Sequence, residues 1–415
     1  MSLSRIFAPF SSRNYRLYFI GQVISLIGTW MTQTASLWLV YHLTASAFLL
    51  GVVGFASQMP SFLLSPLAGV WIDRANRFTL FVGTQVLSML QSLALAYFAL
   101  TNTITVGHLI GLSVLQGLIN AVDMPVRQAL VLDFVQQKEN LSSAIALNSS
   151  MFNGARLVGP AIAGFVIAKF GAGGCYLVDG LSYLAVLAAL GMMNIKKIER
   201  ALAQRHPWHE LREGFHYAFG FSPIWSLIVL VATISFLGFS YAVLMPIFAR
   251  DIFGGDARSL GFLMAASGLG AILGAGYLGS RKTVRGLGTV ISLGGGLMGA
   301  GLIGFALSVH FYFSMGCLTL VGLGGVLMVA SCNTLLQTIV EDSKRGRVMS
   351  FFVMAFTGTM PLGNLVTGFL AGVIGAPSAV AISGLVCLGA AYLFYRSLPQ
   401  LRAAAAPVMA RLNLG

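Results

Sequence analysis

Long apolar runs alternate with short polar segments along the 415 residues of the chain. Each run holds about 20 or more largely apolar residues, the length that an α-helix needs to cross a bilayer. The pattern therefore predicts an all-α polytopic membrane protein with twelve spanning helices. The predicted spans cover residues 17–42, 46–72, 78–100, 104–124, 141–170, 173–193, 223–250, 257–280, 286–308, 311–340, 346–374 and 376–398.

The longest connection, residues 194–222, divides the spans six and six. We expect an N-terminal six-helix bundle over residues 1–193, a cytoplasmic linker over 194–222, a C-terminal six-helix bundle over 223–398 and a cytoplasmic tail over 399–415.

The linker carries the pattern of an amphipathic helix. Trp208, Leu211 and Phe215 recur at helical spacing, opposite charged and histidine side chains, which predicts a helix on the inner membrane surface. His209 and Glu213 lie on the polar face, but no HExxH motif is present, so a solvated face is favoured over a metal site.

The two halves repeat in sequence. GPAIAGFVIAKFGA (159–172) aligns without gaps on GNLVTGFLAGVIGA (363–376), and GVWIDR (69–74) aligns on GYLGSR (276–281) at nearly the same offset. Parallel halves of six spans, related about an axis along the membrane normal, are typical of secondary transporters. We therefore expect two pseudo-symmetric six-helix bundles.

Composition agrees with a membrane protein. Hydrophobic residues make up 57% of the chain and charged residues only 9%, against about a quarter charged in a soluble domain. The net charge of +13 lies in short loops and not on one face, so nucleic acid is not an expected partner. The four cysteines lack CxxC or zinc spacing, and we expect no disulfide framework, metal or cofactor.

The distribution of basic residues predicts the orientation. With the N-terminus inside, 21 of the 25 Lys and Arg residues fall on the inner side, while Lys169, Arg250 and Arg258 fall outside and Arg156 lies within a span. Cytoplasmic loops carry the excess of basic residues. We expect a multi-pass inner-membrane protein with both termini cytoplasmic.

Arg156, in the run NGARLVGPAIAGF, is the charged group that most needs a partner. An arginine at the centre of a span costs about 2.5–3.5 kcal/mol on insertion scales, so it should face the bundle interior and an anion. The nearest acid is Asp179 on the next span. Two interpretations stay open: a structural charge network of Arg156 with Asp179, or an anion or proton site in a cavity.

Two acids are candidates for proton chemistry. Asp179 is the best intramembrane acid, because desolvation and a movable arginine could shift its proton affinity in opposite directions. Asp123 shares a helical face with Gln116 and Asn120 and lies toward the inner end of the fourth span, which favours a role at a cytoplasmic gate.

Polar side chains at helical spacing outline a substrate cavity. A stripe on the first span, with amides and one tyrosine elsewhere, gives the predicted cavity residues Gln22, Ser25, Thr29, Gln33, Asn120, Asn153, Tyr241, Asn333 and Asn364. Gly159, Pro160 and Gly164 are predicted to kink the fifth span and permit close helix packing.

The segment GVWIDRANR, residues 69–77, resembles the loop motif of the major facilitator superfamily. Gly69, Asp73, Arg74 and Arg77 match the motif, and Asn76 stands where the family usually has Gly. The segment GARLVGPAIAG resembles the fifth-helix motif of antiporters in that superfamily, with alanine in place of two glycines. The segments 124–160 and 345–351 resemble the secretion branch that includes the siderophore (enterobactin) exporters.

This resemblance, which covers nearly the whole chain, implies two six-helix bundles, a central cavity and alternating access. We expect an inner gate in which Asp73 meets Arg127 or the start of the eleventh span. The predicted gate residues are Gly69, Asp73, Arg74, Arg77, Arg127, Arg345 and Arg347. Thr29 stands where many proton-coupled relatives carry an acid, so a first-helix carboxylate is excluded as the proton carrier.

These observations predict a secondary active transporter, monomeric in the lipid bilayer, that exports an amphipathic small molecule such as a drug-like compound or siderophore in exchange for protons. A lysophospholipid flippase, an uncoupled facilitator and a transport-inactive signalling protein remain alternatives. An ATP-driven pump is disfavoured because GYLGSRKT, the nearest approach to a phosphate-binding loop, has Arg281 where the second Gly must be. An enzyme is disfavoured because the spans offer no acid pair and no histidine pair.

Overall fold

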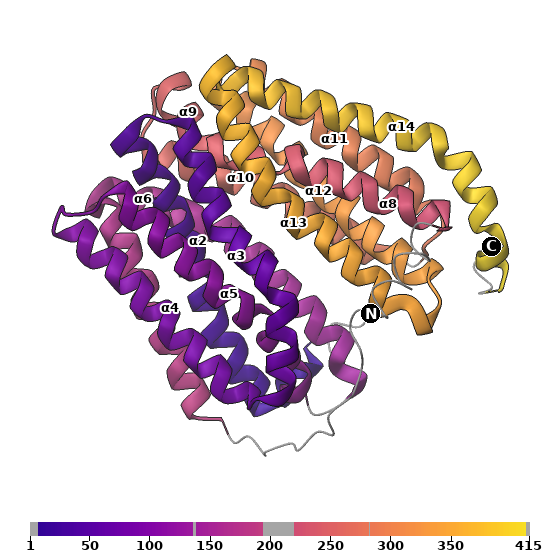
Figure 1. Cartoon of the computed structure of the whole chain (residues 1–415), viewed down its shortest axis with the longest axis horizontal. Coiled ribbons are helices and arrows are strands. Elements are labelled where there is room, and N and C mark those ends of the chain that lie inside the picture. Colours follow the sequence, from indigo (N-terminus) through magenta and orange to yellow (C-terminus); the bar gives the residue numbers. More distant parts are fainter. Residues whose placement is uncertain (1–6, 136–137, 194–219, 282, 412–415) are drawn as a thin grey trace. The chain divides into compact units, whose positions relative to one another are not determined.

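A computed structural model of the chain describes residues 7–135, 138–193, 220–281 and 283–411 (Figure 1). Every element in these ranges is helical, and eleven of the described helices are long and apolar enough to cross a membrane. The chain divides into two compact units, Met1–Ala203 with Ala249–Ala265 and Gln204–Phe248 with Ala266–Gly415.

The first unit is built from five long helices. After the short turn η1 (Ala8–Ser11) come α2 (Arg13–Thr44), α3 (Ala47–Arg74), α4 (Arg77–Leu100), α5 (Val106–Phe134) and, after η2 (Lys138–Asn140), α6 (Leu141–Gly191). Both α2 and α4 pack along α6, and α3 packs along α5 (Figure 1).

The 51-residue helix α6 is interrupted at Gly171, close to the turn predicted between residues 170 and 173. Its φ of 71° and ψ of 178° are accessible to glycine because it lacks a Cβ. Gly375, the position that matches Gly171 in the internal repeat, ends α13 with a φ of 85°. The same residue type therefore turns the chain at equivalent places in the two halves.

Helix α5 continues to Phe134, so the predicted end at residue 124 was wrong. Pro125 lies inside the helix and does not end it. The extra turns bury Val126, Leu130 and Phe134 in an apolar cluster with Tyr15 and neighbouring side chains. This burial offsets the backbone hydrogen bond that proline removes.

The segment Ala249–Ala265 packs within the first unit. Tyr41 of α2 donates a hydrogen bond to Asp251, and the rings of Phe165 and Phe262 meet edge to face with centroids 5.7 Å apart. The backbones also approach closely here, since a Cβ added to Gly261 would lie 2.5 Å from the Pro160 carbonyl oxygen.

The second unit begins with irregular helix where one span, 223–250, is predicted. It contains α8 (Ser222–Thr233), a π-helical turn η3 (Ile234–Gly238), a 3₁₀ turn η4 (Ser240–Leu244) and α9 (Met245–Ile247), followed by η5 (Phe248–Ile252). Gly238 and Pro246 lie at these changes of helix type, as expected of the two residue types that break regular helix.

The rest of this unit consists of long helices. They are α10 (Ala257–Ser280), which begins in the first unit, α11 (Leu287–Leu307), α12 (Phe311–Ile339), α13 (Asp342–Ile374) and α14 (Ala376–Arg411). Helix α11 packs against α12 and α14, and α13 packs against η3. Helix α14 continues to Arg411, beyond the predicted end of its span at residue 398. The predicted amphipathic helix of the linker, with His209 and Glu213, lies outside the described residues.

Candidate proton and substrate site

Asp179 is buried where α2, α4 and the second segment of α6 meet. It is 2% exposed, and its Oδ2 accepts hydrogen bonds from Thr32 Oγ1 at 2.8 Å and Ser92 Oγ at 2.9 Å. Its Oδ1 faces Gly28, where an added Cβ would lie 2.7 Å away. Oδ1 accepts no hydrogen bond from the residues that the structure describes. Three helices of one unit thus enclose this carboxyl, and both hydroxyls donate to the same oxygen, Oδ2.

Arg156 does not pair with Asp179, so the predicted charge network of these two residues was wrong. The hydrogen-bond partners of Asp179 are hydroxyls, and the Arg156 guanidinium carbon lies 5.9 Å from the centroid of the Trp30 ring. Trp30 and Thr32 are two residues apart on α2, so their side chains point about 200° apart around the helix. Helix α2 therefore separates the arginine from the acid.

Asp123 lies in a second buried cluster, between α4 and α5. It is 2% exposed and forms an ion pair with Arg127, one turn further along α5. Its Oδ1 also accepts hydrogen bonds from Thr84 Oγ1 at 2.8 Å and Gln85 Nε2 at 2.7 Å. The structure thus joins two predicted site residues, Asp123 and Arg127, in one charge cluster with α4.

The donors that α4 supplies to the two acids were missed by the sequence analysis. Thr84, Gln85, Ser88 and Ser92 all lie on the buried side of α4. Polar residues at i, i+1, i+4 and i+8 in TQVLSMLQS are the signal of this face in the sequence. Ser88 Oγ accepts a hydrogen bond from Gln116 Nε2 at 3.2 Å, so this polar face continues onto α5.

Asn120 joins that polar face, since its Oδ1 accepts a hydrogen bond from Gln116 Nε2 at 3.1 Å. Asn120 is half-buried. This predicted cavity residue therefore belongs to an interhelical amide network in the first unit.

The predicted polar stripe of the first span divides into a buried and an exposed part. Gln22 and Ser25 are buried, whereas Thr29 and Gln33 are exposed. Neither amide atom of Gln22 has a hydrogen-bond partner among the described residues. Thr29 donates to the Ser25 carbonyl at 3.0 Å, and half-buried Asn153 donates to a carbonyl one turn earlier in α6. Thr29 and Asn153 thus each donate a hydrogen bond to a backbone carbonyl of their own helix.

The predicted cavity residues of the second unit lie in different surroundings. The Tyr241 hydroxyl is buried and hydrogen bonds to Ser267 Oγ at 2.9 Å. Gln337 Nε2 donates to Asn333 Oδ1 at 2.5 Å on α12. Asn364 is 1% exposed, and neither atom of its amide has a partner within the described part of the chain.

Gly159, Pro160 and Gly164 form a close-packed helix surface. A Cβ on Gly159 would lie 2.5 Å from Trp30 Cβ, and one on Gly164 would lie 2.8 Å from the Ala257 carbonyl oxygen. Helical backbone continues through all three, and the one departure from helical φ and ψ angles recorded inside α6 lies at Gly171.

The predicted gate residues lie at helix ends. Helix α3 ends at Arg74 and α4 begins at Arg77, after Asn76, whose Oδ1 caps α4 by accepting from the backbone N–H groups of Phe78 and Thr79. Arg345 and Arg347 lie in the first two turns of α13. The structure does not describe the side chains of Asp73 and Arg74 or the surroundings of Gly69, so the gate contact of Asp73 stays a prediction.

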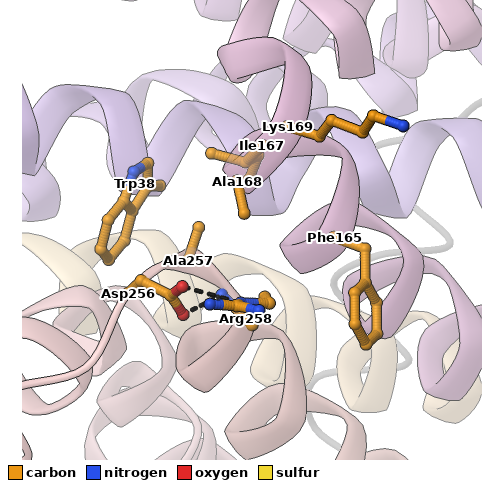
Figure 2. A pocket seen from close by; sticks show the side chains of 8 residues that line it. All are labelled: Trp38, Phe165, Ile167, Ala168, Lys169, Asp256, Ala257 and Arg258. Atoms are coloured by element: carbon orange, nitrogen blue, oxygen red, sulfur yellow. Dashed lines mark hydrogen bonds and ion pairs between the residues drawn. The ribbon is translucent and has the colours of Figure 1, made fainter.

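A shallow pocket of about 510 Å³ lies between α2, α6 and the start of α10 within the first unit. Figure 2 shows Trp38 near the Asp256–Arg258 pair, with Lys169 and Phe165 projecting away from that pair. Arg258 donates to Asp256 through its Nε at 2.8 Å and its backbone N–H at 2.9 Å. Partial burial raises the pKa of Asp256, but hydrogen bonds from Arg258 and from the Ser259 backbone outweigh this and hold it below its usual value.

Among the described residues, no group of three or more His, Cys, Asp or Glu side chains gathers. The four cysteines are buried free thiols. The chemistry of the first unit is instead that of two buried acids with different partners, one held by hydroxyls and the other paired with arginine.

Comparison with known proteins places this architecture in a family. The family model described as transmembrane secretion effector matches residues 4–413. The staphyloferrin A transporter of Staphylococcus aureus is 27% identical over 384 residues, covering 92% of this chain and 95% of that protein. The enterobactin exporter of Shigella boydii is 26% identical over 268 residues, covering 64% and 63%. A crystal structure of a bacterial homologue of the human lysosomal transporter Spinster superposes with a TM-score of 0.67 at 14% identity, over 99% of this chain and 98% of the other.

The eleven membrane-capable helices and the family match define a polytopic membrane transporter. The chain belongs to the transmembrane secretion effector family of the major facilitator superfamily, whose match spans nearly its full length. The resemblance to the branch with siderophore exporters is thereby confirmed. The family relation also confirms that the protein is a transporter and not an enzyme.

Proposed function

We propose that the protein is a proton-coupled exporter of an amphipathic small molecule, either a siderophore or a drug-like compound. It works by alternating access as a monomer of twelve spans in the inner membrane, with both termini cytoplasmic. The span count is supported by the eleven membrane-capable helices together with the interruption of α6 at Gly171.

Matching contacts in the two units support a pair of related bundles. Helix α4 packs with α5 and α6, and α11 packs with α12 and α14 in the corresponding order. Gly159 lies against Trp30 of the first span, and Gly363, its partner in the internal repeat, abuts Phe236 of the seventh. A glycine at the same repeat position thus permits the same kind of helix contact in each half.

The substrate class is carried over from the relatives. Two relatives are transporters of siderophores, one of staphyloferrin A and one of enterobactin. The proposed cavity residues remain those of the sequence analysis, with Thr29 and Gln33 of α2 the exposed members of the first-span stripe. The proposed inner gate keeps Asp73, with Arg127 now held by Asp123.

The observation that carries proton coupling is the enclosed carboxyl of Asp179. Burial in a low-dielectric interior disfavours an ionised carboxylate unless a cation or several donors compensate it. Thr32 and Ser92 supply two neutral donors to one oxygen only. A small movement of α2 against α6 would remove one donor and favour proton uptake, which is the property that an antiporter needs.

Proton release on substrate addition tests the proposal. Purified protein in weakly buffered detergent receives staphyloferrin A, enterobactin, ethidium or lysophosphatidylcholine in turn, beside the variants Asp179→Asn and Asp256→Asn. We expect release in the wild type and in Asp256→Asn, because Asp256 lies in a loop and is partly exposed, and its loss in Asp179→Asn.

Two outcomes would redirect the assignment. Binding of a siderophore or ethidium without proton release would indicate an uncoupled facilitator. Binding of lysophosphatidylcholine alone would favour the lysophospholipid flippase. Release that persists in Asp179→Asn would remove Asp179 from the coupling step.

A further inference from the structure

The two buried acids of the first unit lie beside the same face of α4. Ser92 donates to Asp179, while Thr84 and Gln85 donate to Asp123. The contacts to the two acids are therefore separated by about 12 Å along the helix, from residue 84 to residue 92.

Ser88 lies midway between these contacts, one helical turn from each. Its hydroxyl is buried and is bonded to Gln116 of α5. The steps from Ser88 to Thr84 and to Ser92 each cover about 6 Å of rise, a gap that one bridging water can span with two hydrogen bonds. Polar atoms thus follow one another along α4 from the first acid to the second.

A buried tyrosine lies close to Asp179 on α6. Tyr183 is 5% exposed and lies one turn beyond Asp179. The other titratable groups around Asp179 are Cys175 and Tyr176, also on α6.

Helix packing alone does not account for all of these groups. Interhelical hydrogen bonds between polar side chains do hold membrane helices together. However, Gln85 Oε1 is buried and accepts no hydrogen bond from the described residues. Buried polar atoms are normally paired, so an acceptor left open beside Asp123 indicates a place for water.

We propose that the buried polar face of α4 is the route by which protons pass between Asp179 and the Asp123–Arg127 pair at the predicted inner end. The route consists of Ser92, Ser88, Gln85 and Thr84. It runs inside the N-terminal bundle, separated by α2 from Arg156. This inference rests on the proposed proton coupling, and it adds a path to the proposed carrier.

The test follows protonation of Asp179 by time-resolved infrared spectroscopy, without any substrate. Protein reconstituted in vesicles receives a pH jump, and the carbonyl stretch of the protonated carboxyl is assigned by its loss in Asp179→Asn. The variants are Ser88→Ala and Gln85→Met, with Gln91→Met as the matched control. Gln91 is a buried glutamine on the same helix that donates to the Leu112 carbonyl and contacts neither acid.

We expect protonation of Asp179 to slow by about tenfold or more in Ser88→Ala and Gln85→Met, equivalent to losing one hydrogen bond from the barrier. Gln91→Met keeps the wild-type rate, and Ser92→Thr, which retains the hydroxyl, checks that a changed α4 side chain still folds and conducts. Unchanged rates in both path variants overturn the route, as does equal slowing in Gln91→Met.

The result separates this inference from the proposed function. If the wild type releases protons on substrate addition and Asp179 protonation is not slowed in the path variants, the coupling proposal stands and the route is refuted. If the path variants slow Asp179 protonation but the wild type releases no protons with any substrate, the route stands and coupled export is refuted.

Discussion

Gly28 makes the Asp179 site possible, because it lets α2 approach α6. A Cβ at this position would lie 2.7 Å from Asp179 Oδ1, 2.9 Å from Asp179 Cα and 2.9 Å from Ser182 Oγ. Carbon atoms prefer separations of about 3.5–4.0 Å. Since one of the three neighbours is backbone, a side-chain rotation cannot relieve the contact, and the helices must separate by about 0.6 Å or more.

Two effects of Gly28→Ala oppose each other. Replacing glycine by alanine inside a helix stabilises it by up to about 1 kcal/mol. Overpacking a well-packed contact costs about 1–3 kcal/mol. We expect the steric cost to prevail, so that the free energy of unfolding falls by about 1 kcal/mol and the hydrogen bonds from Thr32 and Ser92 to Asp179 lengthen.

Gly154→Ala is the matched control, because this helical glycine of α6 has no heavy atom within 4 Å of the added Cβ. Its thermal midpoint in detergent should equal or exceed that of the wild type, whereas that of Gly28→Ala should be lower. Gly28→Ala should also lose substrate-linked proton release. A Gly28→Ala protein as stable as Gly154→Ala, with normal proton release, would refute the claim that α2 and α6 confine this carboxyl.

Two further predictions concern the charges of the first unit. Arg127→Ala leaves Asp123 buried without its cation and should lower the free energy of unfolding by about 3 kcal/mol. Adding Asp123→Asn to this variant should recover most of that loss. Equal thermal midpoints of the single and double variants would contradict the pairing. Asp256 accepts from the first backbone N–H groups of α10, so Asp256→Ala should cost about 1 kcal/mol or less at neutral pH. Because its folded-state pKa is lowered, this contribution is complete above the ordinary Asp pKa and is lost as pH falls through the lowered value; the difference in thermal midpoint between wild type and Asp256→Ala should therefore shrink on acidification.

The spans were predictable because the bilayer imposes a length on apolar runs, and glycine marks the turn at Gly171. The end of α5 was not, since Val126 and Leu130 are buried only through their packing with Tyr15. The mixed helix types between residues 234 and 252 depend on tertiary packing. An apolar pattern alone does not encode them.

The sequence predicted the acids of the candidate site, but it did not predict the side chains that bind them. Asp179 is noticeable because a carboxyl within an apolar span is costly. Its hydroxyl donors, Thr32 and Ser92, are residue types that apolar helices carry for many reasons, so only the packing of α2 and α4 identifies them. The pairing with Arg156 was wrong because it depends on the rotation of α2, which neither the spacing nor the depth of residues reveals.

That rotation also bears on how coupling could work without a first-helix acid. Asp179 contacts Gly28 and Thr32, while Thr29 and Gln33 of the same helix are exposed roughly a quarter of a turn or more away. If substrate binds to the exposed stripe and the proton to Asp179, the two ligands meet adjacent faces of one helix. A displacement of α2 by the substrate then changes the hydrogen bond from Thr32, and with it the proton affinity of Asp179, which makes the packing of α2 on α6 the coupling element.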